Sequence, residues 1–261
     1  MTPNKETPLL RVTELSHYYG DQVGCEEINL EVYNGEVLGI VGESGSGKTT
    51  LLKIISGLLP PTQGTIEFDK RIEGSSDIYQ MSEPERRLLM RTDWGIIYQN
   101  PKDGLRMNVS AGANVGERLM AVGARNYSYI RAESNDWLNK VEMDLGRIDH
   151  FPKTFSGGML QRLQIARNLI TKPRLVFMDE PTSGLDVSVQ ARLLDLVRGL
   201  VNQLGISCVI VSHDLGVMRL LSHRLMVMKS GKVVEQGLTD QVLDDPQAPY
   251  TQLLVSSILP V

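Results

Sequence analysis

Short apolar runs alternate with amphipathic stretches along most of the chain. The runs at 37–41, 175–178 and 208–211 have the length and continuity of strands that are buried on both faces. The segments 159–170 and 187–204 instead place apolar residues three and four positions apart, which predicts helices. Because strands and helices alternate in this way, the pattern predicts an α/β fold with a parallel sheet.

Other segments predict additional strands and a helical region. Alternating residues between Leu9 and Val32, interrupted at Tyr19–Asp21, predict a hairpin-like pair of strands. Between Val109 and Arg147 the apolar residues are mostly at helical spacings. The segment Ser82–Arg91 begins with serine, proline and acidic residues, which predicts a short capped helix. Further strands are predicted at 65–68, 95–98, 225–228 and 232–235.

A glycine-rich stretch follows the first buried run. Its glycines let the backbone curl, so that several N–H groups and a helix N-terminus can point at the phosphates of a nucleotide. Lys48 is expected to bridge the β- and γ-phosphates from an exposed loop position, and the Thr49 hydroxyl to bind a phosphate-bound Mg²⁺. An ordinary Gly/Ser turn would not explain the full pattern between a strand and a helix. The candidate nucleotide-binding residues are Gly42, Glu43, Ser44, Gly45, Ser46, Gly47, Lys48, Thr49 and Thr50.

Two carboxylates end the buried run at 175–178. Parallel strands present ligand sites at their carboxyl ends, so Asp179 is expected to hold Mg²⁺, often through water, and Glu180 to polarise an attacking water. Adjacent acids also commonly cap a following helix, but the phosphate loop favours the catalytic pair. His213 follows the run at 208–211 and can contact a γ-phosphate or water there, although a lone histidine is more often structural.

Composition excludes some classes of function. The chain has 261 residues and a formal net charge of -4, which gives no global attraction to nucleic acid or to an anionic membrane. Cys25 and Cys208 lack metal or redox spacing and are expected in the core. Residues 1–6 contain no apolar signal core, and no run approaches the roughly 18 apolar residues of a membrane span. We therefore expect a soluble cytoplasmic protein without membrane insertion and without a nucleic-acid partner.

Six elements in one order resemble the ATP-binding-cassette ATPases. They are Tyr19, the loop 42–49, Gln99, Phe155–Met159, the strand 175–180 and His213, and residues 183–186 match the inter-subunit loop of that family. The resemblance covers nearly the whole chain. It implies an α/β P-loop NTPase of ATP-binding-cassette type, with a RecA-like parallel-sheet core, an antiparallel β subdomain and a helical insertion.

The same resemblance implies a domain plan. A single cassette domain is expected at 8–255, with a nucleotide-binding core at 8–100 and 171–240. The helical subdomain is expected at 101–170, and a C-terminal tail at 241–261.

The resemblance also assigns roles around ATP and Mg²⁺, which such enzymes hydrolyse to ADP and phosphate. Gln99 becomes a coupling residue that senses and binds Mg²⁺, and His213 a contact of the γ-phosphate. Tyr19 becomes the platform for adenine. From the residues alone, stacking on a purine and a half-buried strand tyrosine are equally good interpretations, and Tyr18 is an alternative to Tyr19.

A second phosphate contact is implied at the start of a helix. In this family the signature motif binds the γ-phosphate of the ATP held by the other subunit, which implies a head-to-tail homodimer with two ATP between the chains. The matching residues here are Ser156, Gly157 and Gly158. Met159 stands where the family usually has glutamine, which leaves the phosphate-facing residues intact, so activity is expected.

Further segments are similar to two different groups within this family. Residues 244–254 are similar to the C-terminal segment of dipeptide, oligopeptide and nickel importer ATPases. Residues 103–112, 116–125 and 192–200 are similar to the ATP-binding subunits of the bacterial carbon-phosphorus lyase system. The second similarity implies docking on the soluble core subunits of a phosphonate-degrading complex, and an importer ATPase is the alternative.

A cluster of basic residues in the helical insertion suggests how such a partner is bound. Since the coupled partner contacts this region in the family, the cluster predicts an acidic partner, although a solvated helix face is the commoner explanation. The basic residues are Lys102, Arg106, Arg118, Arg125 and Arg131.

Two other classes fit less well. A nucleotide-dependent binding module with little hydrolysis would not need a positioned base such as Glu180. A P-loop kinase would leave residues 156–158 without a role.

Overall fold

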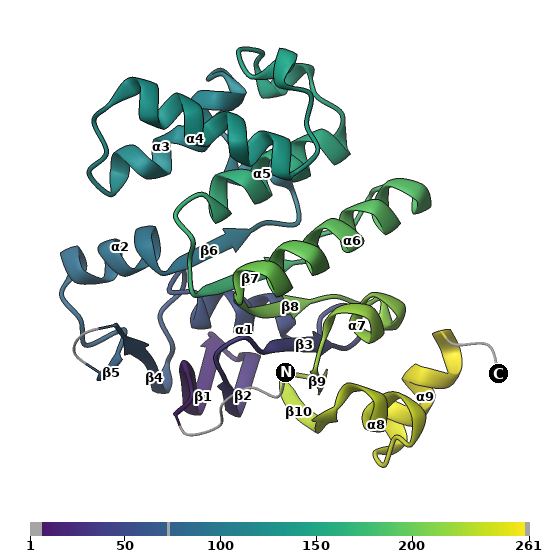
Figure 1. Cartoon of the computed structure of the whole chain (residues 1–261). Coiled ribbons are helices and arrows are strands. Elements are labelled where there is room, and N and C mark those ends of the chain that lie inside the picture. Colours follow the sequence, from purple (N-terminus) through teal and green to yellow (C-terminus); the bar gives the residue numbers. More distant parts are fainter. Residues whose placement is uncertain (1–6, 72–73, 259–261) are drawn as a thin grey trace. The chain divides into compact units, whose positions relative to one another are not determined.

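The computed structural model describes residues 7–71 and 74–258, and these form two compact units. The first unit comprises the chain up to Arg86 together with the residues from Gly205 onward, and the second comprises Arg87–Leu204 (Figure 1). The N-terminal segment 1–6, in which no signal core is predicted, lies outside the described residues. Of the helices in the described ranges, none has the length and apolar content needed to cross a membrane.

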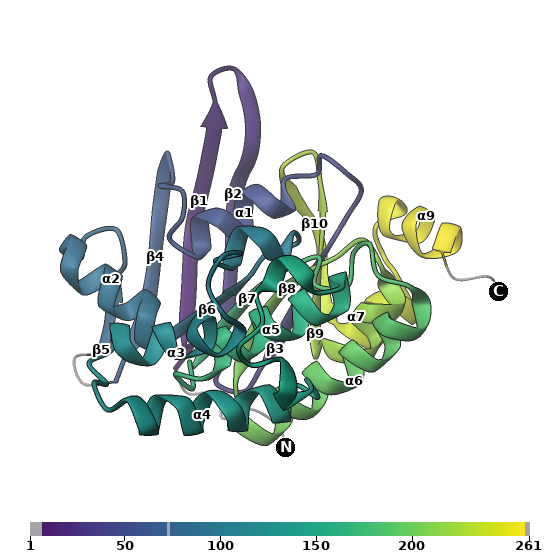
Figure 2. The same cartoon turned by 90° about the horizontal axis from the view of Figure 1, so that it is seen from above.

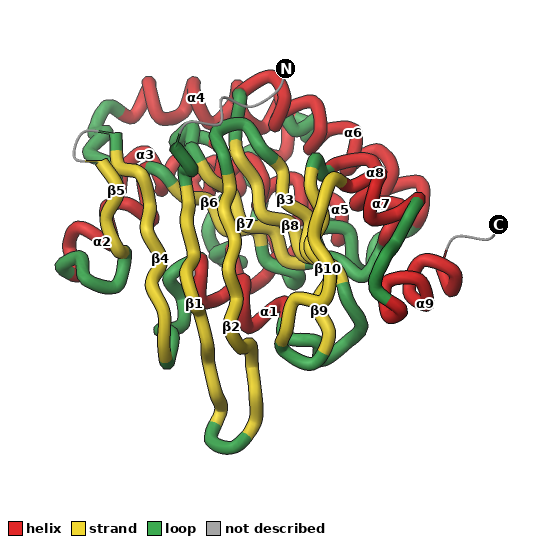
Figure 3. The backbone as a smooth tube through the Cα atoms, turned by 90° about the horizontal axis from the view of Figure 1, so that it is seen from below, coloured by secondary structure: helices red, strands yellow, loops and turns green. Residues whose placement is uncertain are grey.

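An antiparallel sheet occupies part of the first unit and confirms the predicted hairpin. Its strands lie in the order β2-β1-β4-β5, and Figure 3 shows them side by side in yellow. Figure 2 shows the β1–β2 hairpin extending beyond β4. The sequence did not predict β5, because its residues Gly-Ser-Ser-Asp are polar and carry no strand pattern. The strands are β1 (Leu10–Tyr19), β2 (Gln22–Val32), β4 (Gln63–Lys70) and β5 (Gly74–Asp77).

The second sheet of this unit is built around β3 (Val37–Val41). β3 is parallel to β8 (Ser207–Val211) and to β9 (Arg224–Lys229), and β10 (Lys232–Leu238) is antiparallel to β9. All residues of β3 and β8 are buried, as their continuous apolar runs predict. The helices of the unit are α1 (Lys48–Ile55), α7 (Leu215–Leu221), α8 (Thr239–Asp244) and α9 (Pro249–Ile258).

The second unit combines a parallel strand pair with helices. β6 (Trp94–Ile97) is parallel to β7 (Leu175–Asp179). Helices α3, α4 and α5 pack against one another (Figure 1). The side chains of Val115, Trp137 and Leu163, one on each helix, are fully buried. This confirms the predicted helical character of the region. The helices are α2 (Glu83–Thr92), which spans the boundary in sequence, α3 (Ala111–Ala121), α4 (Tyr127–Lys140), α5 (Gly157–Leu169) and α6 (Val187–Leu204).

Three short 3-10 turns connect these elements, at Pro101–Gly104, Leu145–Arg147 and Pro152–Thr154. Cys25 and Cys208 lie in the core as predicted, and the methionines of β9 and α7 are buried there too. The finer boundaries predicted at 8–100, 101–170, 171–240 and 241–261 stay predictions.

Candidate functional site

The glycine-rich loop forms a tight cradle at the end of β3. Gly42 and Gly47 have φ angles of 153° and 99°, in the region that favours glycine. A Cβ at Gly42 would lie 2.2 Å from the Met228 carbonyl oxygen, and one at Gly47 would lie 2.3 Å from that of Gly24. α1 begins at the next residue, and its N-cap Gly47 has no side chain to accept from the first-turn N–H groups. The loop therefore fits a phosphate group.

Lys48 is buried, which corrects the prediction of an exposed position. Its side chain is 7% exposed, and its Nζ donates to the carbonyl oxygens of Gly42 at 2.7 Å and Glu43 at 2.8 Å. It also donates to the Ser46 hydroxyl at 3.3 Å. The loop curls around its own lysine, and a local pattern does not reveal this. Replacement of Lys48 therefore removes bonds that hold the loop as well as a charge for phosphate.

The structure distinguishes the two neighbouring tyrosines. Tyr18 donates from its hydroxyl to the Glu26 carboxylate at 3.1 Å. Tyr19 is 49% exposed, and its hydroxyl lies 3.5 Å from that of Thr50 on α1, next to the phosphate loop. Its ring also packs edge-on against His17, with 4.6 Å between centroids. Since successive strand residues point to opposite faces, only Tyr19 is on the side of the loop. The geometry favours Tyr19 over Tyr18 as a platform.

His213 follows β8 at the edge where β3 leads into the loop. Ile40 of β3 pairs with Val211, and the Ser212 N–H donates to the Ile40 carbonyl at 3.2 Å. His213 is exposed just beyond this pair. His223, in contrast, accepts from the Val37 N–H at 3.0 Å through Nδ1, which is a structural role. The first unit thus gathers Tyr19, the loop and His213.

The second unit places Gln99 and the two carboxylates at one sheet edge. Ile97 of β6 pairs with Met178 of β7 in parallel, so Gln99 and Asp179 both follow the carboxyl ends of adjacent strands. Glu180 has a φ of 44°, which non-glycine residues rarely adopt and which often marks a functional site. Since α6 begins only at Val187, the acids do not cap the next helix. The catalytic role of the pair stays a prediction.

The Ser-Gly-Gly segment forms the N-terminus of the 13-residue helix α5. Ser156 is the N-cap, and its hydroxyl accepts from the Met159 N–H at 3.4 Å. Ser156 and Gly157 are exposed. A Cβ at Gly158 would lie 2.7 Å from the Val189 Cγ1 atom, so this position requires a residue without a side chain. An exposed helix N-terminus of this kind suits an anion.

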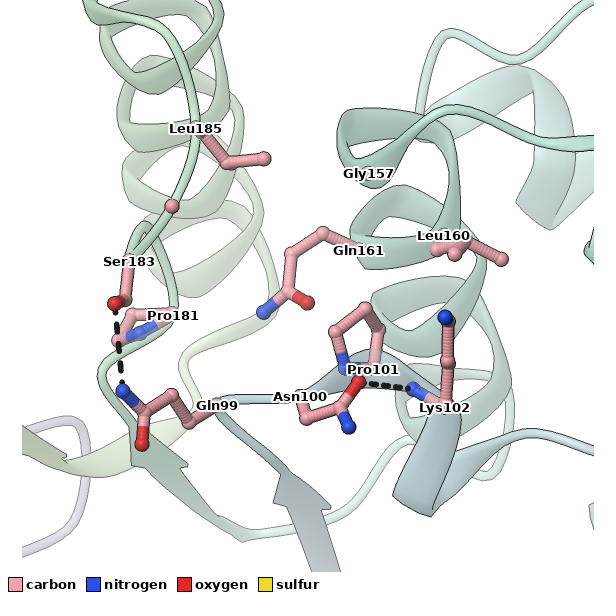
Figure 4. A pocket seen from close by; sticks show the side chains of 11 residues that line it. Gln99, Asn100, Pro101, Lys102, Gly157, Leu160, Gln161, Pro181, Ser183 and Leu185 are labelled. Atoms are coloured by element: carbon pink, nitrogen blue, oxygen red, sulfur yellow. Dashed lines mark hydrogen bonds between the residues drawn. The ribbon is translucent and has the colours of Figure 1, made fainter.

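A cavity of about 270 Å³ connects these parts of the second unit. It is lined by residues of three segments: Gln99–Lys102, the start of α5, and the turn Pro181–Leu185 (Figure 4). Gln99 donates from Nε2 to the Ser183 hydroxyl at 3.3 Å across it. The structure therefore brings Gln99, Gly157 and the inter-subunit loop around one cavity.

Three arginines of the basic cluster bond within the chain, and an acidic partner for this region stays a prediction. Arg106 lies 2.6 Å from the Glu117 carboxylate, and Arg131 donates to both oxygens of Asp149 at 2.6 and 2.7 Å. Arg125 donates to carbonyl oxygens of its own turn. The folded chain thus brings an acid beside Arg106 and another beside Arg131, whereas Arg125 bonds only backbone carbonyls.

Arg118, the fourth of these arginines, is a structural residue. Its guanidinium donates to the carbonyl oxygens of Trp94 at 2.6 Å, Arg91 at 3.1 Å and Met90 at 3.3 Å. Burial lowers the pKa of Arg118 to about 10, which still leaves it charged at neutral pH. Arg118 therefore binds the end of α2 to β6 and is not available to a partner.

Sequence reasoning missed two features near the candidate site. Tyr250 of α9 accepts from the Glu43 N–H of the phosphate loop at 3.1 Å. Its position within the segment 244–254, which was recognised only as a family feature, was the available signal. The other feature is the set of polar residues on α5, Gln161, Gln164 and Asn168, whose spacing on one face of an apolar helix could have revealed it.

No group of three or more His, Cys, Asp or Glu side chains in residues 7–71 and 74–258 could hold a metal ion by itself. A nucleotide-bound Mg²⁺ takes most of its ligands from phosphate oxygens and water. The Asp179 carboxylate and the Thr49 hydroxyl, each described within its own unit, carry hard oxygen atoms of the kind that Mg²⁺ prefers, and their role as Mg²⁺ ligands stays a prediction.

Comparison with known sequences identifies close relatives. A family model described as ABC transporter matches residues 25–183. The chain is 64% identical to a protein of Escherichia coli K12 named for phosphonates utilization, the ATP-binding protein PhnK, over 97% of this chain and 98% of that protein. It is 35% identical to the dipeptide transport ATP-binding protein DppD of the same strain, over 96% of this chain and 78% of DppD.

Solved structures share the fold. The ATP-binding cassette MJ0796, in a dimeric post-hydrolysis state bound to ADP and phosphate, has a TM-score of 0.79 and 28% identity, covering 88% of this chain and 98% of that one. CbiO1 of Clostridium perfringens, part of the transporter complex cbiONQ, also has a TM-score of 0.79, with 29% identity over 98% of this chain and 97% of that one.

Proposed function

Because the chain belongs to the ABC transporter family and is an ATPase of that family, we propose that it couples ATP hydrolysis to a carbon-phosphorus lyase assembly in phosphonate degradation. The observation that carries this proposal is the 64% identity, over 97% of the chain, to the phosphonates utilization protein PhnK. We propose that this coupling takes place in the cytoplasm and that the partners are the soluble core subunits of the lyase.

The phosphate-binding residues act by electrostatics. Loop N–H groups bind the phosphates, and Lys48 exchanges its bonds to loop carbonyls for bonds to the β- and γ-phosphates. Thr49, Asp179 and Gln99 are the residues that would hold Mg²⁺, which would neutralise charge on the phosphates. Tyr19 stacks on adenine.

Glu180 provides the base for hydrolysis. It polarises the water that attacks the γ-phosphate, and His213 contacts the same phosphate from the end of β8. The left-handed backbone at Glu180 directs its side chain differently from that of Asp179, which allows the neighbouring carboxylates to have separate roles. A binding module with little hydrolysis would have no use for this arrangement.

The complete enzyme is proposed to be a homodimer. Ser156, Gly157 and Gly158 of one subunit contact the γ-phosphate held by the loop of the other, so the two chains pair head to tail with two ATP between them. The dimeric state of the related cassette MJ0796 supports this pairing.

Trapping the dimer tests the chemistry. Glu180→Gln keeps the shape of the side chain but removes the base, so ATP should remain bound and the dimer should accumulate in sizing chromatography with Mg-ATP. Lys48→Ala should abolish this dimer, while Lys53→Ala, at an exposed position of the same helix, should leave it intact. A Glu180→Gln variant that stays monomeric at saturating Mg-ATP would refute either the pairing or the role of Glu180.

The second candidate is the ATPase subunit of a dipeptide, oligopeptide or nickel importer, which the 35% identity to DppD favours. Affinity purification from the native host in Mg-ATP separates the two. Recovery of soluble carbon-phosphorus lyase subunits supports the first proposal. Stoichiometric recovery of an integral membrane permease would support the importer instead.

A further inference from the structure

Three buried amide side chains form a ladder on one face of α5. Gln161, Gln164 and Asn168 are three and four residues apart, so they lie along one side of the helix. Each is at most 2% exposed. Burying a polar group without a hydrogen-bond partner costs free energy, so the partner of each of these three side chains has to be identified.

Two members of this amide ladder bind the edge of β6. Asn168 accepts from the Ile96 N–H at 3.0 Å through its side-chain oxygen. Gln164 accepts from the Tyr98 N–H at 2.7 Å and donates to the Tyr98 carbonyl at 3.2 Å. Because Ile96 and Tyr98 are two residues apart, both present their N–H groups to the same side. The amides therefore bind the strand as a neighbouring strand would.

Gln161 is the next member of the ladder, one turn closer to the start of α5. Its Oε1 accepts from the Gln164 Nε2 at 3.2 Å. Its own Nε2 is buried and has no hydrogen-bond partner among the residues that the structure describes. Figure 4 shows the Gln161 side chain pointing from α5 into the cavity that Gln99 and Asn100 also line.

The missing partner can be located from the spacing. The bonded residues are 96 and 98, so the next residue at the same spacing is Asn100, which lies in the bend that follows the end of β6. Asn100 accepts from the Asp103 N–H at 3.0 Å through its carbonyl and from the Lys102 N–H at 3.2 Å through its side chain. A carbonyl oxygen can accept a second bond, so the Asn100 carbonyl, which lines the same cavity as Gln161, still has capacity for a donor.

We propose that Gln161 is a positioning residue, whose Nε2 donates to an oxygen of the Gln99–Asn100 segment when nucleotide is engaged and so ties Gln99 to the helix that begins at Ser156. This inference rests on the proposed function, in which both ends of that connection act on nucleotide. A shift of α5 toward a phosphate would then move Gln99 with it through the amide ladder.

The test uses variants of the full chain. Gln161→Met keeps the length of the side chain without the amide, and Gln161→Asn keeps the amide but shortens it. Gln203→Met, at an exposed position of α6, is the matched control. Each is measured for steady-state ATP hydrolysis against Mg²⁺ concentration, and for hydrogen exchange of the backbone amides at 98–102 with and without Mg-ATP.

Both Gln161 variants should lower kcat about fivefold and raise the Mg²⁺ concentration for half-activity, because Gln99 is no longer held. Gln99→Ala should have a similar effect, and the Gln161→Met/Gln99→Ala double variant should be no worse than Gln99→Ala alone, since the two residues act in one connection. In wild type, Mg-ATP should slow exchange at 98–102, and the Gln161 variants should lose this protection.

Two outcomes would overturn the positioning role. One is a double variant whose loss of kcat equals the product of the losses in the two single variants. The other is unchanged protection of the backbone amides at 98–102 against hydrogen exchange in both Gln161 variants. If wild-type protein shows no hydrolysis at all, the proposed ATPase coupling fails, but loss or retention of nucleotide-dependent protection still decides the role of Gln161.

Discussion

Gly24→Ala provides a sharp test of how the first unit holds a nucleotide base. Gly24 lies in β2 between the Tyr19 ring and the start of α1. A Cβ there would lie 2.9 Å from the Thr50 Cγ2 atom, 3.0 Å from the Tyr19 Cε2 atom and 3.1 Å from the His17 carbonyl oxygen. The backbone carbonyl cannot yield, so the added methyl group should push the Tyr19 ring and the Thr50 methyl group aside.

The magnitude follows from what the displaced ring contributes. Overpacking of this kind costs about 1–3 kcal/mol, and stacking of a base on an aromatic ring is worth about 1–3 kcal/mol. If displacement removes about half of the stacking, ATP binding weakens by about 1 kcal/mol, or roughly fivefold. Phosphate binding should change little, because the loop N–H groups are not displaced.

Calorimetric titration with Mg-ATP and with magnesium tripolyphosphate separates base from phosphate. We expect Gly24→Ala to weaken binding of ATP and not of tripolyphosphate. Gly199→Ala is the control, since a Cβ at that position meets no atom within 4 Å. Equal weakening of both ligands would show that the phosphate loop was disturbed, and unchanged ATP affinity would refute stacking by Tyr19.

Three further predictions concern groups outside the base site. Arg118→Met should lower the free energy of unfolding by about 2–4 kcal/mol in denaturant titrations, because buried carbonyl oxygens lose their donor; a loss below 0.5 kcal/mol would contradict its structural role. Tyr250→Phe removes the acceptor of the Glu43 N–H and should raise the KM for ATP a few-fold at unchanged kcat, while an unaltered KM would show that α9 does not support the loop. Burial raises the pKa of Cys25 to about 11 and of Cys208 to about 12, so a disulfide reagent at pH 8 should modify both thiols only after unfolding; rapid modification of native protein would refute this.

Much of the candidate site could be predicted because its parts are local. The phosphate loop is eight consecutive residues between a strand and a helix, and the observed β3 and α1 flank it as predicted. Asp179 and His213 stand at the ends of apolar runs that the structure confirms as buried strands. In each case the residue and its structural context are adjacent in sequence, so the pattern contains both.

Other contacts could not be predicted from the sequence, because the residues that make them are far apart along the chain. Gln164 binds Tyr98 at a separation of 66 residues, and Tyr250 reaches Glu43 across 207. The helical region looked basic because Arg106 and Arg131 were counted without the acids beside them. Neither propensity nor spacing indicates which distant residue a side chain will meet.

The sequence by itself therefore determined the order of the buried strands and of the longer helices, the phosphate loop and the carboxylates at the strand end, since backbone preference and burial pattern are properties of short segments. Tertiary structure alone decided that Tyr19 and not Tyr18 lies beside Thr50, and that the amides of α5 replace a strand at the edge of β6. These outcomes depend on which face of a folded element meets another, and that choice is made only when distant segments pack and each buried polar group must find its partner.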